Sequence, residues 1–300
     1  MTPHVTVVGS ANIDMTFRMK RLPVLGETVF GSGFVHGYGG KGANQAVAIA
    51  RLGAVAKFIG RVGKDDFGGQ IYEHLAREPI DVTHLSFDDL QPTGTAAILV
   101  DEHGENSIVV VPGANMMLTA SHVRSAAADI QKSAVVLAQH ETPFEATIEA
   151  FRIARSAGRR TLLNPAPALN PPEELLTLTD ICIPNESELR HLTGCGTDSM
   201  QDVRAAAAAL QTRGPLIVIV TLGERGAFVL GPNIEYFVEG IAVQAVDTSG
   251  AGDAFCGALA CDLAHGMGLT EAVKRANAVA AMSVTREGTQ ASFPRRADLP

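Results

Sequence analysis

A run of small residues near the end of the sequence leads into a helix-forming segment and ends in a carboxylate. The run reads DTSGAGD at 247–253, and residues 254–263 have the composition and spacing of a helix. At a helix N-terminus small residues let backbone N–H groups converge, and the partial positive charge there can stabilise a phosphoryl group in transit. Asp253 would accept the proton of an attacking alcohol, whereas a mere helix cap would not explain the preceding Gly-Ala-Gly. This anion hole would consist of the backbone amides of Gly250, Ala251 and Gly252.

A second glycine-rich segment reads GGKGAN at 39–44. It resembles a phosphate loop only superficially, because Lys41 is followed by Gly42 and not by the Ser or Thr that would hold Mg²⁺. The GSAN segment at 9–12 does not make a dinucleotide fingerprint either, which disfavours an NAD-linked oxidoreductase. We interpret the glycine-rich segment as a turn that brings backbone and Asn44 against a small polar ligand.

The elements that must position these residues follow from the alternation of short apolar runs with helical patterns. Five runs are expected to be buried strands: 5–8, 134–138, 161–163, 181–183 and 216–220. Three further segments are expected to be helices: 44–52, 143–156 and 201–213. This alternation predicts an α/β fold with a doubly wound, mostly parallel sheet flanked by helices. Such sheets bind ligands beyond the carboxyl ends of their strands, where polar residues follow each expected strand here.

Two stretches break this rhythm. Residues 15–38 and 93–113 alternate apolar and polar side chains between Gly and Pro, as half-exposed strands do. We expect these two excursions to form a small separate β-sheet, which would serve as a lid over the site or as a dimer surface.

Composition limits the class of protein. The 300 residues are 46% hydrophobic and 19% charged, which predicts a single compact globular unit spanning 1–300. A net charge of -8 without a basic stripe disfavours nucleic-acid binding. No signal peptide or membrane-spanning run is expected, and four cysteines without C-x-x-C spacing suit a reducing compartment. The expected location is therefore the cytoplasm.

Taken together, the motifs resemble the PfkB carbohydrate kinases, and within that family its ribokinase branch. The resemblance covers the whole chain, with its parts in the family's order: GSANID at 9–14, GGKGANQA at 39–46, Glu141, NPAP at 164–167, PNE at 184–186, TLGERG at 221–226 and DTSGAGD at 247–253. It implies a ribokinase-like fold with a β-lid. It also implies ATP-dependent phosphorylation of D-ribose at the 5-hydroxyl, with D-ribose 5-phosphate as the product.

The resemblance also implies roles for matching positions. Asp253 would deprotonate the ribose 5-hydroxyl. Residues expected to surround the sugar are Asn12, Asp14, Gly40, Lys41, Gly42, Ala43, Asn44, Glu141 and Asp253. Residues expected to bind ATP are Asn185, Thr221, Leu222, Gly223, Glu224, Arg225, Gly226, Gly252, Asp253 and Asn277.

Two cations and a partner follow from the same resemblance. Asn185 and Glu188 form the family's N-x-x-E motif, which would hold Mg²⁺ through water. The positions that match the family's K⁺ site are Asp247, Ser249, Ser283, Arg286, Gly288 and Ser292. The β-lid would pair with its twin in a homodimer.

Several alternatives remain open at this point. Another kinase of the family, such as a deoxyribokinase, fructokinase or nucleoside kinase, would share the SGAGD motif at 249–253. Asn12, Asp14 and Asn44 favour ribose over a deoxy sugar, because a missing 2-hydroxyl would leave one of these groups unpaired. A catalytically silent sugar-binding protein is disfavoured by the intact base and anion-hole motif.

Overall fold

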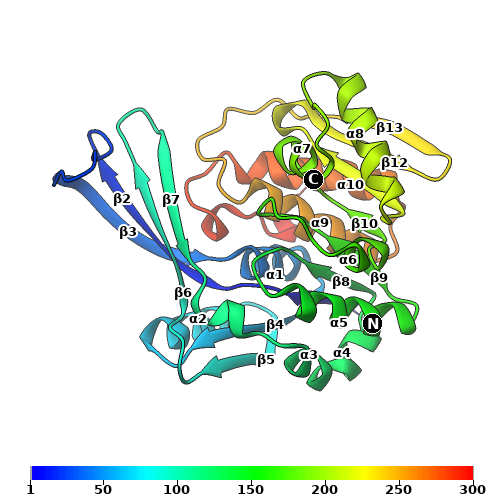
Figure 1. Ribbon diagram of the computed structural model, residues 1–300, viewed down its shortest axis with the longest axis horizontal. Coiled ribbons are helices and arrows are strands. Elements are labelled where there is room, and N and C mark those ends of the chain that lie inside the picture. Colours follow the sequence, from blue (N-terminus) through cyan, green and yellow to red (C-terminus); the bar gives the residue numbers. More distant parts are fainter. Residues whose placement is uncertain (1, 300) are drawn as a thin grey trace.

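The computed structural model describes residues 2–299, in which a nine-stranded sheet forms the centre of the molecule (Figure 1). Its strand order is β13-β12-β11-β10-β9-β8-β1-β4-β5. The strands are β1 (His4–Val8), β4 (Val55–Gly63), β5 (Ile80–Asp88), β8 (Val135–Ala138), β9 (Arg160–Leu163), β10 (Ile181–Cys182), β11 (Ile217–Thr221), β12 (Gly226–Gly231) and β13 (Ile234–Glu239). All neighbours from β11 to β5 pair in parallel, while β12 and β13 form an antiparallel edge.

Helices cover both faces of this sheet. Their bounds are α1 (Lys41–Leu52), α2 (Asp66–Arg77), α3 (Ala120–Ser125), α4 (Ala127–Lys132), α5 (Phe144–Ser156), α6 (Glu173–Thr177), α7 (Glu186–Thr193), α8 (Met200–Thr212), α9 (Ala251–Ala264) and α10 (Leu269–Ser283). Alternation along β1 separates two cores: Val5 and Val7 pack with α1, α2, α9 and α10, whereas Val8 packs with α3 to α8. None of the described helices has the length and apolarity needed to cross a bilayer.

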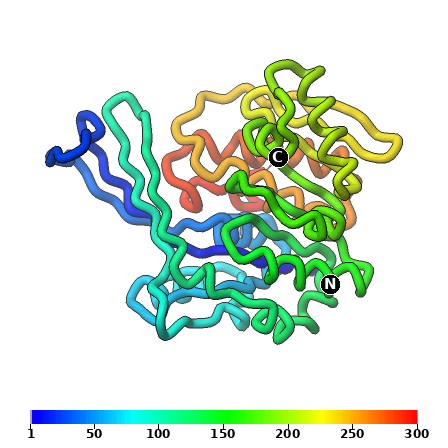
Figure 2. Tube along the Cα trace, viewed as in Figure 1, coloured from blue at the N-terminus to red at the C-terminus, as the bar shows by residue number. Residues whose placement is uncertain are grey.

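A separate four-stranded sheet stands beside this body (Figures 1 and 2). Its order is β3-β2-β6-β7, with β2 (Asn12–Met19), β3 (Gly31–Gly39), β6 (Gly94–Val100) and β7 (Asn106–Val111). The predicted fold class is thus confirmed: a mostly parallel sheet flanked by helices, with a second small sheet. Each expected strand and helix is present, and two expected helices, α1 and α9, begin three residues earlier than expected. The elements that were not expected are β4, β5, β12, β13, α2, α3, α4, α6, α7 and α10.

Candidate active site

Glycines allow α1 to begin directly against the end of β1. A Cβ on Gly42 would lie 2.7 Å from the Gly9 backbone, and one on Gly40 would lie 2.7 Å from Ala11 Cα. Gly40 also has φ of 85°, a left-handed conformation that glycine adopts without strain. The glycine-rich segment therefore places the first turn of α1 over the strand end, at the edge where ligands bind.

Glu141 supplies the cap that α1 lacks. The N-cap residue is Gly40, which has no side chain to satisfy the first amides. The Lys41 N–H instead donates to Glu141 Oε2 over 3.0 Å, and the Ser10 hydroxyl donates to the same oxygen. A carboxylate is stabilised at the positive end of a helix. Glu141 is therefore fixed beside the end of β1 and the start of α1.

Asp253 lies buried in the first turn of α9, with 6% of its surface exposed. Its Oδ2 accepts a hydrogen bond from Asn44 Nδ2, and its Oδ1 accepts one from Gln45 Nε2, both over 2.9 Å. The N-cap residue Gly250 has φ of 75°, and a Cβ there would lie 2.4 Å from Thr289 Cγ2. The start of α9 is thus a tight, uncapped helix end that carries a carboxylate.

A cavity of about 170 Å³ opens at this helix end. It is lined by Lys41, Asn164, Ala166, Ile183, Asn185, Glu188, Thr221, Thr248, Gly250, Ala251, Gly252, Asp253 and Cys256. The lining combines the amides of α9 with one ammonium group and two carboxylates. Such a combination can hold an anionic group next to a proton acceptor.

Charges inside the site influence one another. Burial alone would lower the pKa of Lys41, but the carboxylates of Asp253, Glu141 and Glu188 raise it above its usual value. The pKa of Asp14 is raised from 3.8 to about 6, mainly by burial and also by the negative charges of Glu141 and Asp253. Lys41 therefore stays charged among carboxylates that repel one another.

Asn12 and Asp14 lie on β2, and neither of them lines the cavity. Asp14 lies against Gly39, where a Cβ would come within 2.0 Å of its Oδ2. Asn12 Oδ1 accepts from Asn115 Nδ2 over 2.7 Å, which leaves the Asn12 amide N–H groups for another partner. Asn115, 1% exposed, also accepts from the Ala11 N–H over 2.9 Å.

Asn185 and Glu188 form a capping box at the start of α7. The Glu188 N–H donates to Asn185 Oδ1 and the Asn185 N–H donates to Glu188 Oε2, both over 2.8 Å. Burial raises the pKa of Glu188. Both side chains also line the cavity, so the N-x-x-E motif has a structural role in addition to any role toward a ligand.

The other residues expected to bind ATP lie around the turn after β11. Thr221 lines the cavity, and Gly223–Arg225 forms a 3₁₀ turn that leads into β12. Arg225 pairs with Glu186 over 2.5 Å. Asn277 donates to the Glu239 carbonyl over 3.2 Å, at the end of β13. Of the expected residues Leu222, Gly223, Glu224, Arg225, Gly226 and Asn277, none lines the cavity.

The residues expected around K⁺ lie on two segments that the structure brings together: Asp247, Ser249, Ser283, Arg286, Gly288 and Ser292. The carboxylate of Asp247 joins the segments, because it accepts from the Ser249 N–H and from the Gly288 N–H, each over 2.9 Å. Among residues 2–299 no cluster of three or more His, Cys, Asp or Glu side chains is arranged to hold a metal ion.

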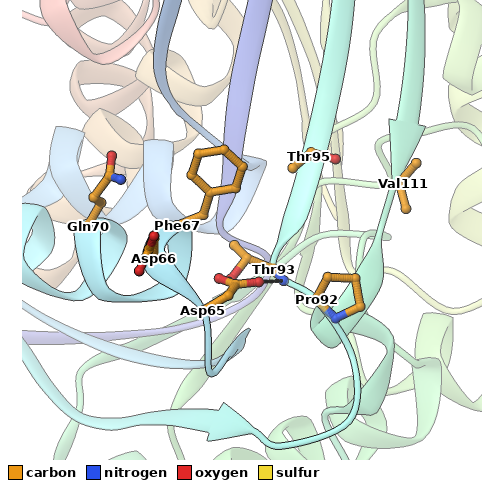
Figure 3. A pocket seen from close by; sticks show the side chains of 8 residues that line it. All are labelled: Asp65, Asp66, Phe67, Gln70, Pro92, Thr93, Thr95 and Val111. Atoms are coloured by element: carbon orange, nitrogen blue, oxygen red, sulfur yellow. Dashed lines mark hydrogen bonds between the residues drawn. The ribbon is translucent and has the colours of Figure 1, made fainter.

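A larger hollow of about 490 Å³ lies elsewhere, between α2 and the small sheet (Figure 3). Its carboxylate Asp65 is already engaged by the Thr93 N–H, the Thr93 hydroxyl and the Gly68 N–H. The second carboxylate is Asp66, and no Lys, Arg or His side chain lines the hollow with it, while Phe67, Pro92 and Val111 offer no reactive group (Figure 3). The smaller cavity at α9 is therefore the candidate active site.

Several residues of the site were not predicted from the sequence. Gln45 holds the second oxygen of Asp253, and Asn164 accepts from Gln45 Nε2 over 3.1 Å. Gln290 donates to Asn44 Oδ1 over 2.9 Å, and Asn115 orients Asn12. The QA that follows GGKGAN and the NPAP at 164–167 were visible signals, whereas nothing in the sequence marks Gln290 or Asn115.

Comparisons with known proteins agree with this geometry. A family model described as pfkB family carbohydrate kinase matches residues 2–296. The chain is 42% identical over 303 residues to a ribokinase of Mus musculus, covering 99% of this chain and 93% of the relative. It is 41% identical over 296 residues to a ribokinase of Haemophilus influenzae, covering 99% and 97%. A solved structure of Arabidopsis thaliana ribokinase complexed with ribose and ATP matches with a TM-score of 0.93 and 34% identity, covering 99% of this chain and 97% of that one.

Proposed function

The chain belongs to the pfkB family of carbohydrate kinases, and on that premise we propose that it transfers the γ-phosphoryl group of ATP to the 5-hydroxyl of D-ribose. It is an ATP-dependent sugar kinase, and its relatives and structural neighbours favour ribose over the other sugars considered. One observation carries the mechanism. The side-chain amides of Asn44 and Gln45 hold Asp253 at the uncapped start of α9, in the cavity that Lys41 also lines.

In the proposed reaction the ribose 5-hydroxyl attacks the γ-phosphorus and the bond between that phosphorus and the β–γ bridging oxygen breaks. Asp253 takes the hydroxyl proton, and ADP leaves. Backbone amides of Gly250, Ala251 and Gly252 stabilise the charge on the transferring group, and Lys41 adds a positive charge. The catalytic contribution is largely positioning and electrostatics, as is usual for phosphoryl transfer.

The sugar would lie between the small sheet and α1. Asn12 and Asp14 approach from β2, Asn44 from α1 and Glu141 from the loop after β8, which supplies both donors and acceptors for hydroxyl groups. The remaining sugar contacts would come from the first turn of α1: Gly40, Lys41, Gly42 and Ala43. The small sheet would then act as the lid, with 15–38 and 93–113 as its two excursions.

ATP would enter the same cavity from the side of β11. Asn185, Thr221 and Gly252 line that cavity, so they are placed for the phosphates. The turn after β11 and Asn277 would form the wall for the rest of the nucleotide: Leu222, Gly223, Glu224, Arg225, Gly226 and Asn277.

Two cations suit residues of this chain. Asn185 and Glu188 offer oxygen ligands of the kind that Mg²⁺ prefers, and one Glu188 oxygen remains beyond the capping box. Bound Mg²⁺ would neutralise charge on the ATP phosphates. The segments joined by Asp247 offer hydroxyl, carbonyl and carboxylate oxygens, which suit K⁺: Ser249, Ser283, Arg286, Gly288 and Ser292 belong to them. K⁺ would stabilise the loop that leads to the anion hole.

The small sheet also suits a homodimer. On its two edge strands, β3 and β7, the side chains of Phe34, Val35, Ile108 and Val109 expose between 54% and 62% of their surfaces, and exposed apolar side chains of this kind favour a partner surface. A second copy of this sheet would cover them. All four cysteines are free thiols, which suits the reducing cytoplasm as the place of action.

An ATP-consumption assay with Mg²⁺ and K⁺ tests the proposed function against ribose, 2-deoxyribose, fructose, arabinose and adenosine. Ribose should be strongly preferred, and Asp253→Ala should lower kcat at least about 10²-fold while ribose binding is largely kept. Turnover near wild type in that variant would remove Asp253 from the role of base. Preference for fructose or adenosine would overturn the substrate, and absence of turnover with every sugar would support a silent sugar-binding protein.

A further inference from the structure

A chain of buried hydrogen bonds continues outward from Asp253. Asn44 Nδ2 donates to Asp253 Oδ2, and Asn44 Oδ1 accepts from Gln290 Nε2, each over 2.9 Å. Gln290 Oε1 then meets His74 Nε2 over 2.8 Å. Asn44 and Gln290 are 5% and 4% exposed, so water offers them few alternative partners. Four residues from four different elements thus form one continuous line.

The carboxylate at one end determines the direction of every bond in this line. An ionised Asp253 can only accept, so Asn44 must present its NH₂ group to it. The Asn44 oxygen then faces Gln290, which must present its own NH₂ group. Gln290 Oε1 consequently faces His74, whose Nε2 must carry the proton. Each residue can satisfy its neighbour in one orientation only.

The far end of this line is well anchored. Arg51 donates to the backbone carbonyl of Gln290, and to that of Phe293 over 3.3 Å. Arg51 is itself held by Glu78 over 2.6 Å, with the two side chains 11% and 9% exposed. The His74 ring stacks on Tyr38 with centroids 3.7 Å apart and planes 8° apart. Gln290 and His74 therefore have little freedom to turn.

We propose that Gln290 is a positioning residue for this kinase, and that with His74 behind it Gln290 locks the Asn44 amide so that its NH₂ group faces Asp253. The inference rests on the proposed role of Asp253 as the base. Without the lock, the Asn44 amide can turn and place its oxygen against the carboxylate, which would then lose a donor and rotate away from the sugar hydroxyl. Asn44 and Asp253 act on the substrate, whereas Gln290 acts only through them.

Two variants of nearly equal size separate this role from simple packing. Gln290→Glu keeps the shape and the acceptor for His74 but removes the donor to Asn44, so the Asn44 amide should turn. We expect kcat to fall about 10- to 100-fold with the ribose KM changed less than about threefold. Gln290→Met packs similarly but has no strong donor or acceptor, so its kcat should lie between that of Gln290→Glu and that of the wild type.

His74 offers a second matched pair. His74→Gln keeps an N–H donor and should retain near wild-type kcat, whereas His74→Phe keeps the ring stacked on Tyr38 but loses the donor and should lower kcat. The opposite order would show that stacking, and not the hydrogen bond, is the contribution of His74, and would remove it from the lock. The double variant Gln290→Met/His74→Phe should be no worse than Gln290→Met alone, because both changes break one chain.

The pH dependence of kcat supplies a readout that loss of packing would not move. Removing a donor from a carboxylate disfavours its ionised form, so the acid limb of the profile should shift to higher pH in Gln290→Glu. The charged groups that face Asp253 are Lys41, Asp14, Glu141 and Glu188, and Glu78, Arg51 and Arg77 surround His74. These groups are unchanged in the variants, but Gln290→Glu adds a carboxyl group that could itself shift the acid limb. Gln290→Met adds no charge, so the shift of the acid limb in that variant serves as the control. An unshifted limb in both variants would overturn the lock.

The lock can also be tested without activity. In the ligand-free protein, ¹⁵N shifts of the His74 ring should show a proton on Nε2 and none on Nδ1, and burial, which lowers the pKa of His74, keeps the ring neutral. A proton on Nδ1 alone would reverse the direction of the chain and overturn the inference. If instead Asp253→Ala stayed active while the ring had the expected proton, the proposed base would fail and the hydrogen-bonded chain would stand.

Discussion

The side-chain amide of Asn115 donates to Asn12 Oδ1 over 2.7 Å across a separation of 103 residues. The same amide donates to the carbonyl of Pro112 over 3.0 Å, at the end of β7. Asn115 thus joins the start of one excursion of the small sheet to the end of the other. It also occupies the Asn12 oxygen, which leaves the Asn12 N–H groups for the proposed sugar.

Asn115→Ala should therefore reduce the discrimination between ribose and 2-deoxyribose about tenfold, the value of one well-placed buried hydrogen bond. The ratio of kcat/KM for the two sugars measures this effect. The matched control is Thr6→Val, which loses a buried hydrogen bond to Ser133 of 2.7 Å away from the site. An unchanged ratio in Asn115→Ala would show that Asn12 is oriented by other contacts.

Replacing either of two glycines at the start of α9 by alanine should have different effects, one on stability and the other on activity. Gly250 has φ of 75° and a Cβ there would meet Thr289 at 2.4 Å, so Gly250→Ala should destabilise the fold by at least about 1 kcal/mol. A Cβ on Gly252 meets nothing within 4 Å in the protein, but Gly252 lines the cavity. Gly252→Ala should keep the melting temperature and lose activity. Equal activity of Gly252→Ala and wild type would move the phosphoryl group away from this helix end.

Asp14 should make the stability of the protein depend on pH. Its pKa of about 6 in the folded state exceeds the ordinary 3.8, so the folded chain binds the proton more tightly than the unfolded chain. This group therefore lowers the free energy of unfolding progressively as pH rises from about 4 to about 6, and fully above that range. Asp14→Asn should raise the free energy of unfolding at neutral pH by no more than about 3 kcal/mol, with no gain below about pH 4.

Urea unfolding at several pH values measures the effect of Asp14→Asn, and ribose affinity should fall in the same variant. A stability difference that is the same at acidic and neutral pH would contradict the assigned cause. If the gain appears only as pH rises, Asp14 exemplifies a site residue that is retained at a cost in stability.

Charges on the small sheet should separate the proposed dimer. Ile108→Asp/Val109→Asp changes neighbouring residues that are 54% and 62% exposed on opposite faces of β7, so a partner on either face would meet a buried charge. Light scattering after size exclusion should give the mass of a dimer for wild type and of a monomer for the variant. Met200→Asp/Leu216→Asp, with residues 38% and 51% exposed elsewhere, should stay dimeric. A monomeric wild type at micromolar concentration would contradict the dimer.

The sequence predicted the fold class better than the individual strands and the helix boundaries. Strands β4 and β5 were missed because polar residues interrupt the apolar pattern of β4. In the structure Lys57 pairs with Asp129, and Arg61 pairs with Asp88 over 2.8 Å, which are contacts that only the folded chain provides. Helix α9 begins at Ala251, inside the motif, because Gly250 in a left-handed conformation is already its N-cap.

The site was predictable where chemistry leaves a local pattern. Glycine spacing indicated the close approach of α1 to β1, and a carboxylate after Gly-Ala-Gly indicated the helix end at Asp253. Gln290 and Asn115 were not predictable, because each acts on the site through an amide contact with a residue more than 100 positions away. Such residues have no spacing rule, since only the tertiary fold sets their distance from the site.

The bond between Gln290 and Asn44 spans 246 residues of the chain. A chain emerging from the ribosome therefore carries the glycine-rich turn long before the residue that completes its surroundings exists. Sugar and nucleotide cannot assist an early folding intermediate through this site, and aid from either ligand must wait until Gln290 has been synthesised. Until then the unfinished chain depends on its two sheets and the helices packed on them to hold its N-terminal half together.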